Sequence, residues 1–153
     1  MKKINNIKTV LAILILTITT TSCGDFEPVI FDPENGQTFV SFGEDRSDIQ
    51  FFNGIPETGF ADIPIVISTI SDVARTVQVE VDLELSSSSP SEYTFNPTVT
   101  IPPGEFVGTL RVDAIFNNLQ FFNTTTVLII TSIGEEGGTI QEGTHTVRMR
   151  RLG

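Results

Sequence analysis

Few side chains in this sequence could take part in covalent or metal chemistry. The chain has one cysteine, Cys23, and one histidine, His145, which lies in the segment THTVRMR. A Ser-His-Asp site would need an activated serine beside His145, and no nucleophile-elbow motif is present. A zinc site needs several histidine or cysteine ligands. We therefore expect no enzyme and no cofactor, because no set of acid, base and nucleophile converges.

The segment before Cys23 has the three parts of an export signal. Residues 1–8 carry all three lysines and no acidic residue, residues 9–18 form the apolar run TVLAILILTI, and residues 19–22 are small and polar. The apolar run has the length of a signal-peptide core. It is too short to span a membrane, which takes ~20 apolar residues. The alternatives are a membrane anchor or buried helix, and a plain secretory signal with a stray cysteine.

The start of the chain, up to Cys23, resembles a bacterial lipoprotein signal. Thr21 and Ser22 fit the small-residue box before the cysteine, whereas Thr20 stands where an aliphatic residue is usual, a departure common in Bacteroidetes-type lipoproteins. The resemblance implies that residues 1–22 are removed and that Cys23 becomes an acylated, palmitate-bearing N-terminus. Acyl chains contribute ~0.8 kcal/mol per buried methylene, so two or more hold a small domain on a bilayer. We therefore expect a lipid-anchored protein of the outer membrane or cell surface, exported across the inner membrane.

The charge of the exported part is strongly acidic. Removal of residues 1–22 takes away all three lysines and leaves six arginines against nineteen acidic residues, a formal net charge of −13. Nucleic-acid binding needs a basic footprint, so we exclude it. An exported domain with a single cysteine forms no internal disulfide, and its core must stabilise it alone.

The mature sequence reads almost entirely as β-structure. Residues 23–37 mix acids, prolines and two glycines, as a tether would, and we expect residues 38–153 to form one domain. In the segment VQVEVDLEL, residues 77–85, valine and leucine alternate with polar residues, which predicts a strand with a buried face that includes Leu83 and Leu85. Glu80, Asp82 and Glu84 then lie on the open face of the sheet. The expected strands are residues 38–42, 63–71, 75–85, 98–101, 105–116, 124–133 and 144–150, with residues 49–52 as an additional edge.

Turn-forming segments such as SSSSPSE, PPG and GEEGG separate these strands. Seven or eight short strands with turns at this spacing predict an all-β fold, an immunoglobulin-like antiparallel β-sandwich.

Residues 91–112, SEYTFNPTVTIPPGEFVGTLRV, resemble the signature of Calx-beta domains and of related Bacteroidetes surface lipoproteins. Glu92 and Tyr93 stand for the acidic residue and tyrosine that precede a short strand, and residues 103–105 form the proline-glycine-acid turn. Glu92 replaces the usual aspartate. With looser agreement the resemblance extends over residues 38–150. It implies a sandwich of Calx-beta topology.

Calx-beta domains are known for binding calcium, but this chain departs from their pattern. Phe116, Asn117 and Asn118 stand where the family has aspartates, and residues 121–124 stand where it has further acids. Calcium takes six to eight oxygen ligands, several of them anionic. The remaining acidic residues of the loops have no ligand spacing, so we interpret them as solvated and expect no metal site: these are Glu44, Asp45, Asp48, Glu135 and Glu136.

Two pairs of phenylalanines could form a contact surface. Phe51 and Phe52, and Phe121 and Phe122, lie beside loop residues in a chain with twelve phenylalanines. Neighbouring residues of an extended chain face opposite ways, so one ring of each pair could point outward. Packing in the core is the alternative. Exposed rings would form a small apolar patch of the kind found at interfaces.

Two kinds of function fit these observations. The first is a non-catalytic surface module, for binding, adhesion or an accessory role, that binds a glycan or a protein at the cell envelope. This prediction rests on resemblance to lipoproteins found with polysaccharide-uptake systems. The alternative is a structural spacer or assembly subunit that contacts another envelope protein through a strand edge.

Overall fold

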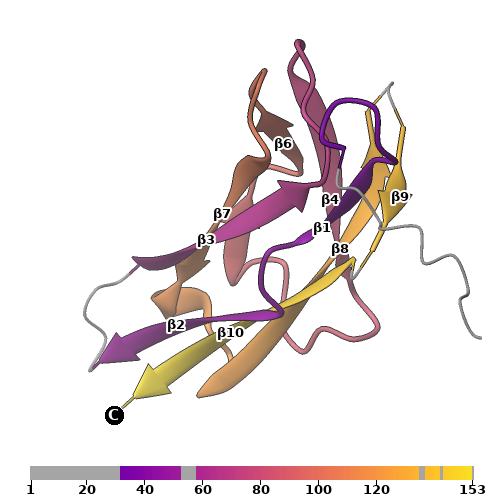
Figure 1. The fold of residues 1–153 in the computed structure, drawn as a ribbon. Coiled ribbons are helices and arrows are strands. Elements are labelled where there is room, and N and C mark those ends of the chain that lie inside the picture. The colour runs from indigo at the N-terminus through magenta and orange to yellow at the C-terminus, as the bar shows by residue number, and fades with distance from the viewer. Residues whose placement is uncertain (1–31, 53–57, 135–136, 142, 153) are drawn as a thin grey trace, which may run out of the picture. The chain divides into compact units, whose positions relative to one another are not determined.

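The computed structural model describes residues 32–52, 58–134, 137–141 and 143–152, and these form two five-stranded sheets (Figure 1). Sheet A has the order β5-β7-β3-β1-β9 and sheet B the order β2-β10-β8-β4-β6. The strands of sheet A are β5 (Tyr93–Phe95), β7 (Val107–Ile115), β3 (Thr58–Ile67), β1 (Phe39–Phe42) and β9 (Thr139–Ile140). The strands of sheet B are β2 (Arg46–Phe52), β10 (Thr144–Leu152), β8 (Asn123–Ile133), β4 (Arg75–Asp82) and β6 (Thr98–Ile101).

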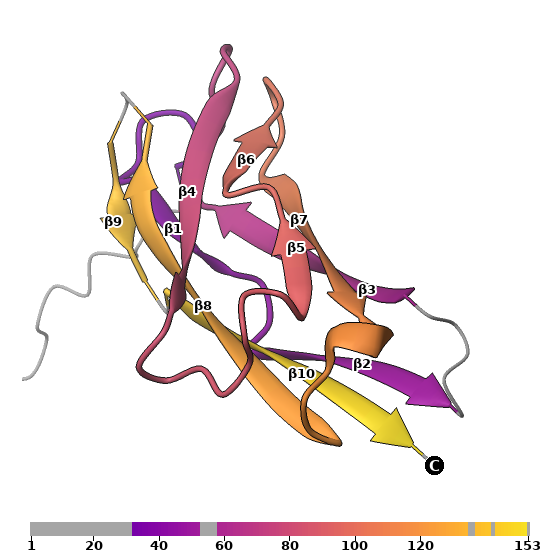
Figure 2. The same cartoon turned by 180° about the vertical axis from the view of Figure 1, so that it is seen from behind.

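The predicted all-β sandwich is confirmed, and it differs from the expectation in two details. The described residues form ten strands instead of the seven or eight expected, because β5 and β9 have only three and two residues and lack a readable period. Two pairs are parallel, β1 with β9 and β2 with β10, while the other pairs are antiparallel. Figure 2 shows the same two sheets from behind.

The core lies between the two sheets and is built from alternate residues of the strands. Val77 and Val79 of β4 are fully buried, as the period-two pattern predicts. Sheet A contributes Ile63, Ile65, Ile67, Leu110 and Val112, and sheet B contributes Ile49, Phe51, Val99, Ile101, Leu128, Val147 and Met149. A core of this size in a chain without an internal disulfide is consistent with burial as the main source of stability.

Strand β4 ends earlier than its sequence pattern indicates. The side chain of Asp82 accepts hydrogen bonds from the backbone N–H groups of Glu84, at 2.9 Å, and Leu85, at 3.1 Å. Its carbonyl oxygen accepts another from Ser86. This turn stops the strand, so Leu83 and Leu85 are exposed and the prediction that they belong to the buried face is wrong.

The last residues of the segment expected to be a tether are hydrogen-bonded to the sandwich. Asp32 Oδ1 accepts bonds from the backbone N–H groups of Glu34 and Asn35, and these bonds, with that of Asn35 the larger effect, lower the pKa of Asp32. The carbonyl oxygen of Pro33 accepts a bond from the N–H of Ile70, in the turn after β3. A turn over residues 32–36 therefore packs against the domain.

Candidate functional site

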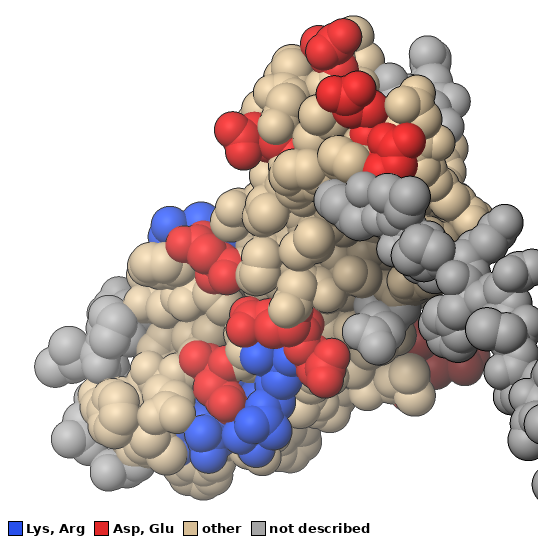
Figure 3. Space-filling view, viewed as in Figure 1, with Lys and Arg blue, Asp and Glu red and all other residues tan. Residues whose placement is uncertain are grey.

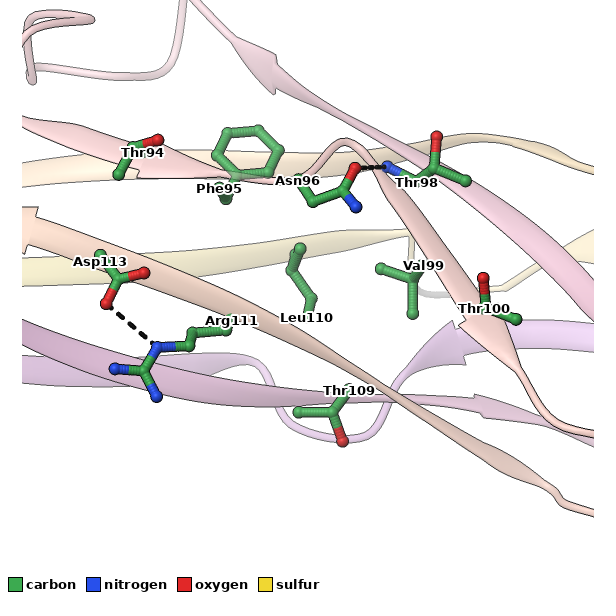
Figure 4. A pocket seen from close by; sticks show the side chains of 10 residues that line it. All are labelled: Thr94, Phe95, Asn96, Thr98, Val99, Thr100, Thr109, Leu110, Arg111 and Asp113. Atoms are coloured by element: carbon green, nitrogen blue, oxygen red, sulfur yellow. Dashed lines mark hydrogen bonds and ion pairs between the residues drawn. The ribbon is translucent and has the colours of Figure 1, made fainter.

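A polar cavity opens at the edge of the sandwich where β5, β6 and β7 meet. Its volume is about 600 Å³. The lining residues are Thr94, Phe95, Asn96, Thr98, Val99, Thr100, Thr109, Leu110, Arg111 and Asp113 (Figure 4). They supply four hydroxyl groups, one amide, one ion pair and one aromatic ring around two buried aliphatic side chains. We call this cavity the β5–β7 groove.

The groove exists because the chain changes sheets between β5 and β6. β5 pairs with β7 in sheet A, and β6 pairs with β4 in sheet B. The connection is a short turn in which Asn96 Oδ1 accepts a hydrogen bond from the N–H of Thr98 at 3.1 Å. Figure 4 shows Val99 and Leu110 between the strands, where they form the apolar base of the groove.

An arginine stacked on an aromatic ring borders the groove. Arg111 Nε donates to Asp113 Oδ1 at 3.1 Å, and the guanidinium carbon lies 3.7 Å from the centroid of the Phe60 ring. The register of β3 and β7 places Phe60 beside Asp113 and Asp62 beside Arg111. Phe60 is 53% exposed. An exposed ion pair of this kind stabilises a fold by only ~0–1 kcal/mol.

The predicted phenylalanine surface is present only in part. Phe51 is fully buried against Phe116, with ring centroids 5.5 Å apart, and the prediction that it belongs to a contact surface is wrong. Phe52, Phe121 and Phe122 are 58%, 64% and 74% exposed. They lie at the end of sheet B where β2 ends and β8 begins.

Arg151 connects part of this surface to the core. Its N–H donates to the carbonyl oxygen of Phe122, and its guanidinium carbon lies 5.5 Å from the Phe122 ring and 4.5 Å from the Phe116 ring. Cation–π contacts of this kind contribute ~0.5–1 kcal/mol at exposed sites. The arginine therefore fixes the position of one exposed ring.

The side chain of His145 is part of the core and links two segments of the chain. Its imidazole is fully buried between the sheets, with Nδ1 2.7 Å from the carbonyl oxygen of Glu44 and Nε2 3.1 Å from Ser47 Oγ. Burial lowers the pKa of His145. Sequence patterns could not predict this bridge, because Glu44 and Ser47 lie 101 and 98 positions before His145 in the chain.

Phe116–Asn118, which the sequence resemblance places where Calx-beta domains have aspartates, form a 3-10 helix. Asn118 Nδ2 donates to the carbonyl oxygen of Ser91 at 2.6 Å. The side chain of Glu92 is buried and accepts hydrogen bonds from the backbone N–H groups of Ser89, at 3.2 Å, and Gln120, at 2.8 Å. Each oxygen of Glu92 thus holds one backbone N–H group of the neighbouring loops in place. In the sequence, Glu92 was identified only as part of the Calx-beta-like signature.

Within the described ranges, no three histidine, cysteine, aspartate or glutamate side chains gather in a way that could hold a metal. Cys23, Glu135 and Glu136 lie outside those ranges. The same part of the chain contains no helix long and apolar enough to cross a membrane.

The sequence matches no protein-family model, and no curated protein matches it. Solved structures do resemble the fold. The apo form of the Calx CBD1 domain superposes with a TM-score of 0.60 at 12% identity, over 77% of this chain and 100% of that one. A two-domain protein of unknown function from Bacteroides fragilis gives 0.57 at 9% identity, over 76% of this chain and 46% of its own.

A candidate carbohydrate-binding protein from Bacteroides ovatus gives a TM-score of 0.56 at 10% identity, over 74% of this chain and 37% of its own. The chain thus spans less than half of the length of these two Bacteroides proteins. At such identities the likeness concerns the fold alone. This chain is a β-sandwich that resembles Calx-beta domains.

Proposed function

We propose that the protein is a non-enzymatic binding module that holds a glycan in the β5–β7 groove. The observation that carries the proposal is the chemistry of the lining: hydroxyl, amide, guanidinium and carboxylate groups surround an apolar base. Ligand sites are typically concave and apolar with a few polar groups that fix orientation. A sugar-binding site needs both polar groups and an apolar surface. The hydroxyl groups of a sugar form hydrogen bonds, while the C–H face of its ring packs on an apolar surface.

Three residues are the main expected contacts. Arg111 and Asp113 offer donors and acceptors next to each other, a pairing suited to adjacent sugar hydroxyl groups. Only the Nε of Arg111 is bonded to Asp113, so the two terminal nitrogens remain as donors. The exposed ring of Phe60 offers an apolar platform beside them. The Bacteroides ovatus neighbour adds weight, since it is a candidate carbohydrate-binding protein of the same fold.

The groove has no arrangement for cleaving a glycan. Glycoside hydrolysis generally requires two carboxyl groups on either side of the scissile bond. Asp113 is the only carboxylate among the lining residues, and it is bonded to Arg111. Binding without turnover is therefore the function that this site supports.

The second part of the proposal concerns location. We propose that Cys23, outside the described residues, is lipidated and anchors the domain in the cell envelope, at the outer membrane or cell surface. The lone cysteine after a short apolar signal is the support for this step.

Glycan titration tests the proposal. We expect the purified protein to bind at least one polysaccharide, found by screening an immobilised glycan panel and measured by calorimetry. Arg111→Gln and Phe60→Ser should each weaken that binding by about tenfold, the effect of losing one good contact. Arg46→Gln, a matched change of an exposed arginine at the opposite edge of sheet B, should not. Binding that is insensitive to both groove variants would contradict the assignment.

The alternative function, a spacer or assembly subunit, is favoured by a different observation. Strand β2 is an edge strand of seven residues, long enough to pair with another chain. This edge lies away from the groove, so both functions can coexist in one molecule.

A further inference from the structure

The four edge strands of the two sheets differ in length. β9, β5 and β6 have two, three and four residues, whereas β2 has seven. Short edge strands are one of the ways in which proteins prevent uncontrolled pairing. β2 pairs with β10 along one side, and the described part of the chain places no strand on its other side (Figure 1). It therefore presents the longest free row of backbone donors and acceptors.

Three arginines converge on one aspartate on the outer face of this edge. Asp48 of β2 lies 2.6 Å from Arg148 Nε, 3.5 Å from an Nη of Arg150 and 3.6 Å from Arg46 Nε. We call these four residues the arginine cluster. The hydrogen bond from Arg148 lowers the pKa of Asp48, so this carboxylate is ionised at neutral pH. Three positive charges then face one negative charge.

The arginine cluster spans the two outermost strands at this edge of sheet B. Arg148 of β10 lies opposite Asp48 of β2 in the register, and Arg150 of β10 lies opposite Gln50, next to it along the strand. Figure 3 shows basic residues gathered over β2 and β10, with acidic residues beside them. Glu44, in the preceding turn, accepts a hydrogen bond from Ser47, and the ion pairs of these arginines among the described residues all go to Asp48.

Stability of the fold does not explain this arrangement. Partly exposed ion pairs contribute little, and a third arginine around one carboxylate adds repulsion. Arg150 Nε is buried and has no hydrogen-bond partner among the described residues. A second carboxylate, supplied from outside, would balance the surplus charge.

An exposed ring lies at the end of the same strand. Phe52 closes β2 and is more than half exposed, with Leu152 of β10 opposite it in the register. Arginine and aromatic residues are enriched in protein–protein interfaces and in their energetic hot spots. The edge thus combines free backbone groups, surplus positive charge and an apolar end.

We propose that β2 receives an extended, carboxylate-bearing segment of a partner protein, which adds to sheet B as an additional strand. Backbone groups of the segment would pair with the free edge, as in other cases of strand addition. Its acidic side chains would meet Arg46 and Arg150. A second copy of this chain is disfavoured, because antiparallel pairing of two β2 strands brings two arginine clusters together. This inference concerns the opposite edge of sheet B from the β5–β7 groove and does not depend on glycan binding.

A synthetic strand tests the inference on the full-length protein in detergent. The probe is a capped seven-residue peptide in which glutamate alternates with threonine and valine, so that all carboxylates fall on one face of the strand. We expect binding that weakens with salt and changes the backbone amide signals of Ile49 to Phe52. Arg46→Gln and Arg150→Gln together should weaken it by about tenfold. Arg111→Gln, in the groove, should leave it unchanged.

Two control peptides separate strand addition from simple charge attraction. Replacement of every glutamate by lysine should abolish binding, and proline at the central position should weaken it by removing a backbone donor. Absence of binding by the glutamate peptide, equal binding by either control, or stronger competition by anionic lipid micelles through the same arginines would overturn the inference. If Arg111→Gln loses glycan binding but still binds the peptide, the strand-addition inference is supported. The glycan proposal and the strand-addition inference can therefore be contradicted independently of each other.

Discussion

The Nδ1 of His145 lies 2.7 Å from the carbonyl oxygen of Glu44, a residue 101 positions earlier in the chain. A carbonyl oxygen only accepts, so Nδ1 carries the proton. The ring of Phe42 covers the imidazole, with ring centroids 5.4 Å apart. The contact ties the turn before β2 to the last strand, and it does so with a side chain that titrates near neutral pH.

This burial makes stability depend on pH. Burial lowers the pKa of His145 below its ordinary value of 6.5, although the Glu44 carbonyl and the carboxylates of Glu44 and Asp45 act in the opposite direction. The unfolded chain therefore binds the proton more readily than the folded one. The stabilisation is fully present above pH 6.5 and is lost as the pH falls from there toward the folded pKa, by at most ~1.4 kcal/mol per pH unit.

The comparison with His145→Gln isolates this effect. Chemical denaturation of both proteins between about pH 7.5 and pH 5.5 should show a falling free energy of unfolding in the native sequence and a flatter profile in the variant. The variant should also be less stable at pH 7.5, because glutamine cannot reproduce both contacts. Parallel profiles over this range would show that His145 does not titrate differently in the folded state.

The turn after β4 gives a second prediction. Asp82→Val removes the oxygen that accepts the N–H groups of Glu84 and Leu85, so we expect the free energy of unfolding to fall by about 1 kcal/mol. Asp82→Asn keeps an acceptor oxygen at the same place and should cost much less. The denaturant midpoints of Asp82→Val, Asp82→Asn and the native protein measure these differences. An unchanged midpoint for Asp82→Val would mean that β4 ends for another reason.

The alternation in β4 explains what sequence reasoning could and could not foresee. Val77 and Val79 are buried as predicted because a strict period of two has one physical solution, a half-buried strand. The end of the strand was missed because the same pattern continues to Leu85. Whether an aspartate lies on a strand or closes a turn depends on local backbone hydrogen bonds, which a period does not encode.

The candidate sites could not be predicted from the sequence, because each of them joins segments that are distant in the chain. Arg148 and Asp48 are 100 positions apart and meet only through the parallel pairing of β2 and β10. The β5–β7 groove depends on where the chain crosses between sheets, and its threonines carry no motif. The phenylalanine pairs did indicate exposed rings, but neighbouring positions alone left open that Phe51 is in the core.

A third prediction concerns calcium. We expect saturating calcium to leave the melting temperature of the protein nearly unchanged, because calcium needs several anionic oxygens and no three acidic, histidine or cysteine side chains gather among the described residues. A ligand at a hundred times its dissociation constant would add ~2.7 kcal/mol of stability. Thermal unfolding with calcium and with a chelator measures this. A shift of several degrees that the chelator reverses would establish a site that the described residues do not reveal.

A fourth prediction concerns the anchor. Cys23→Ser should abolish the proposed lipidation, because Cys23 is the only cysteine in the sequence and follows the segment that the sequence pattern predicts to be an export signal. Labelling of cells with a fatty-acid analogue, followed by capture of the protein, reads this out directly. Thr20→Leu, which brings the box closer to the usual pattern, should keep the label. Equal labelling of the Cys23→Ser protein would contradict lipidation at Cys23.

The last prediction tests how the groove edge is held together. Gly108 of β7 faces β6, and a Cβ at this position would lie 2.9 Å from side-chain atoms of Val99 and Ile101 and 3.1 Å from the carbonyl oxygen of Thr100. Gly108→Ala should therefore lower the free energy of unfolding by about 1–3 kcal/mol, the usual cost of overpacking. Adding Val99→Ala removes one of the colliding side chains, so the double variant should be less destabilised than the sum of the single changes. Thr109→Ala, an exposed neighbour, serves as the control with little effect on stability. If Gly108→Ala unfolds at the same denaturant concentration as the native protein, β6 and β7 do not approach closely at this edge, and the base of the groove is not formed as described.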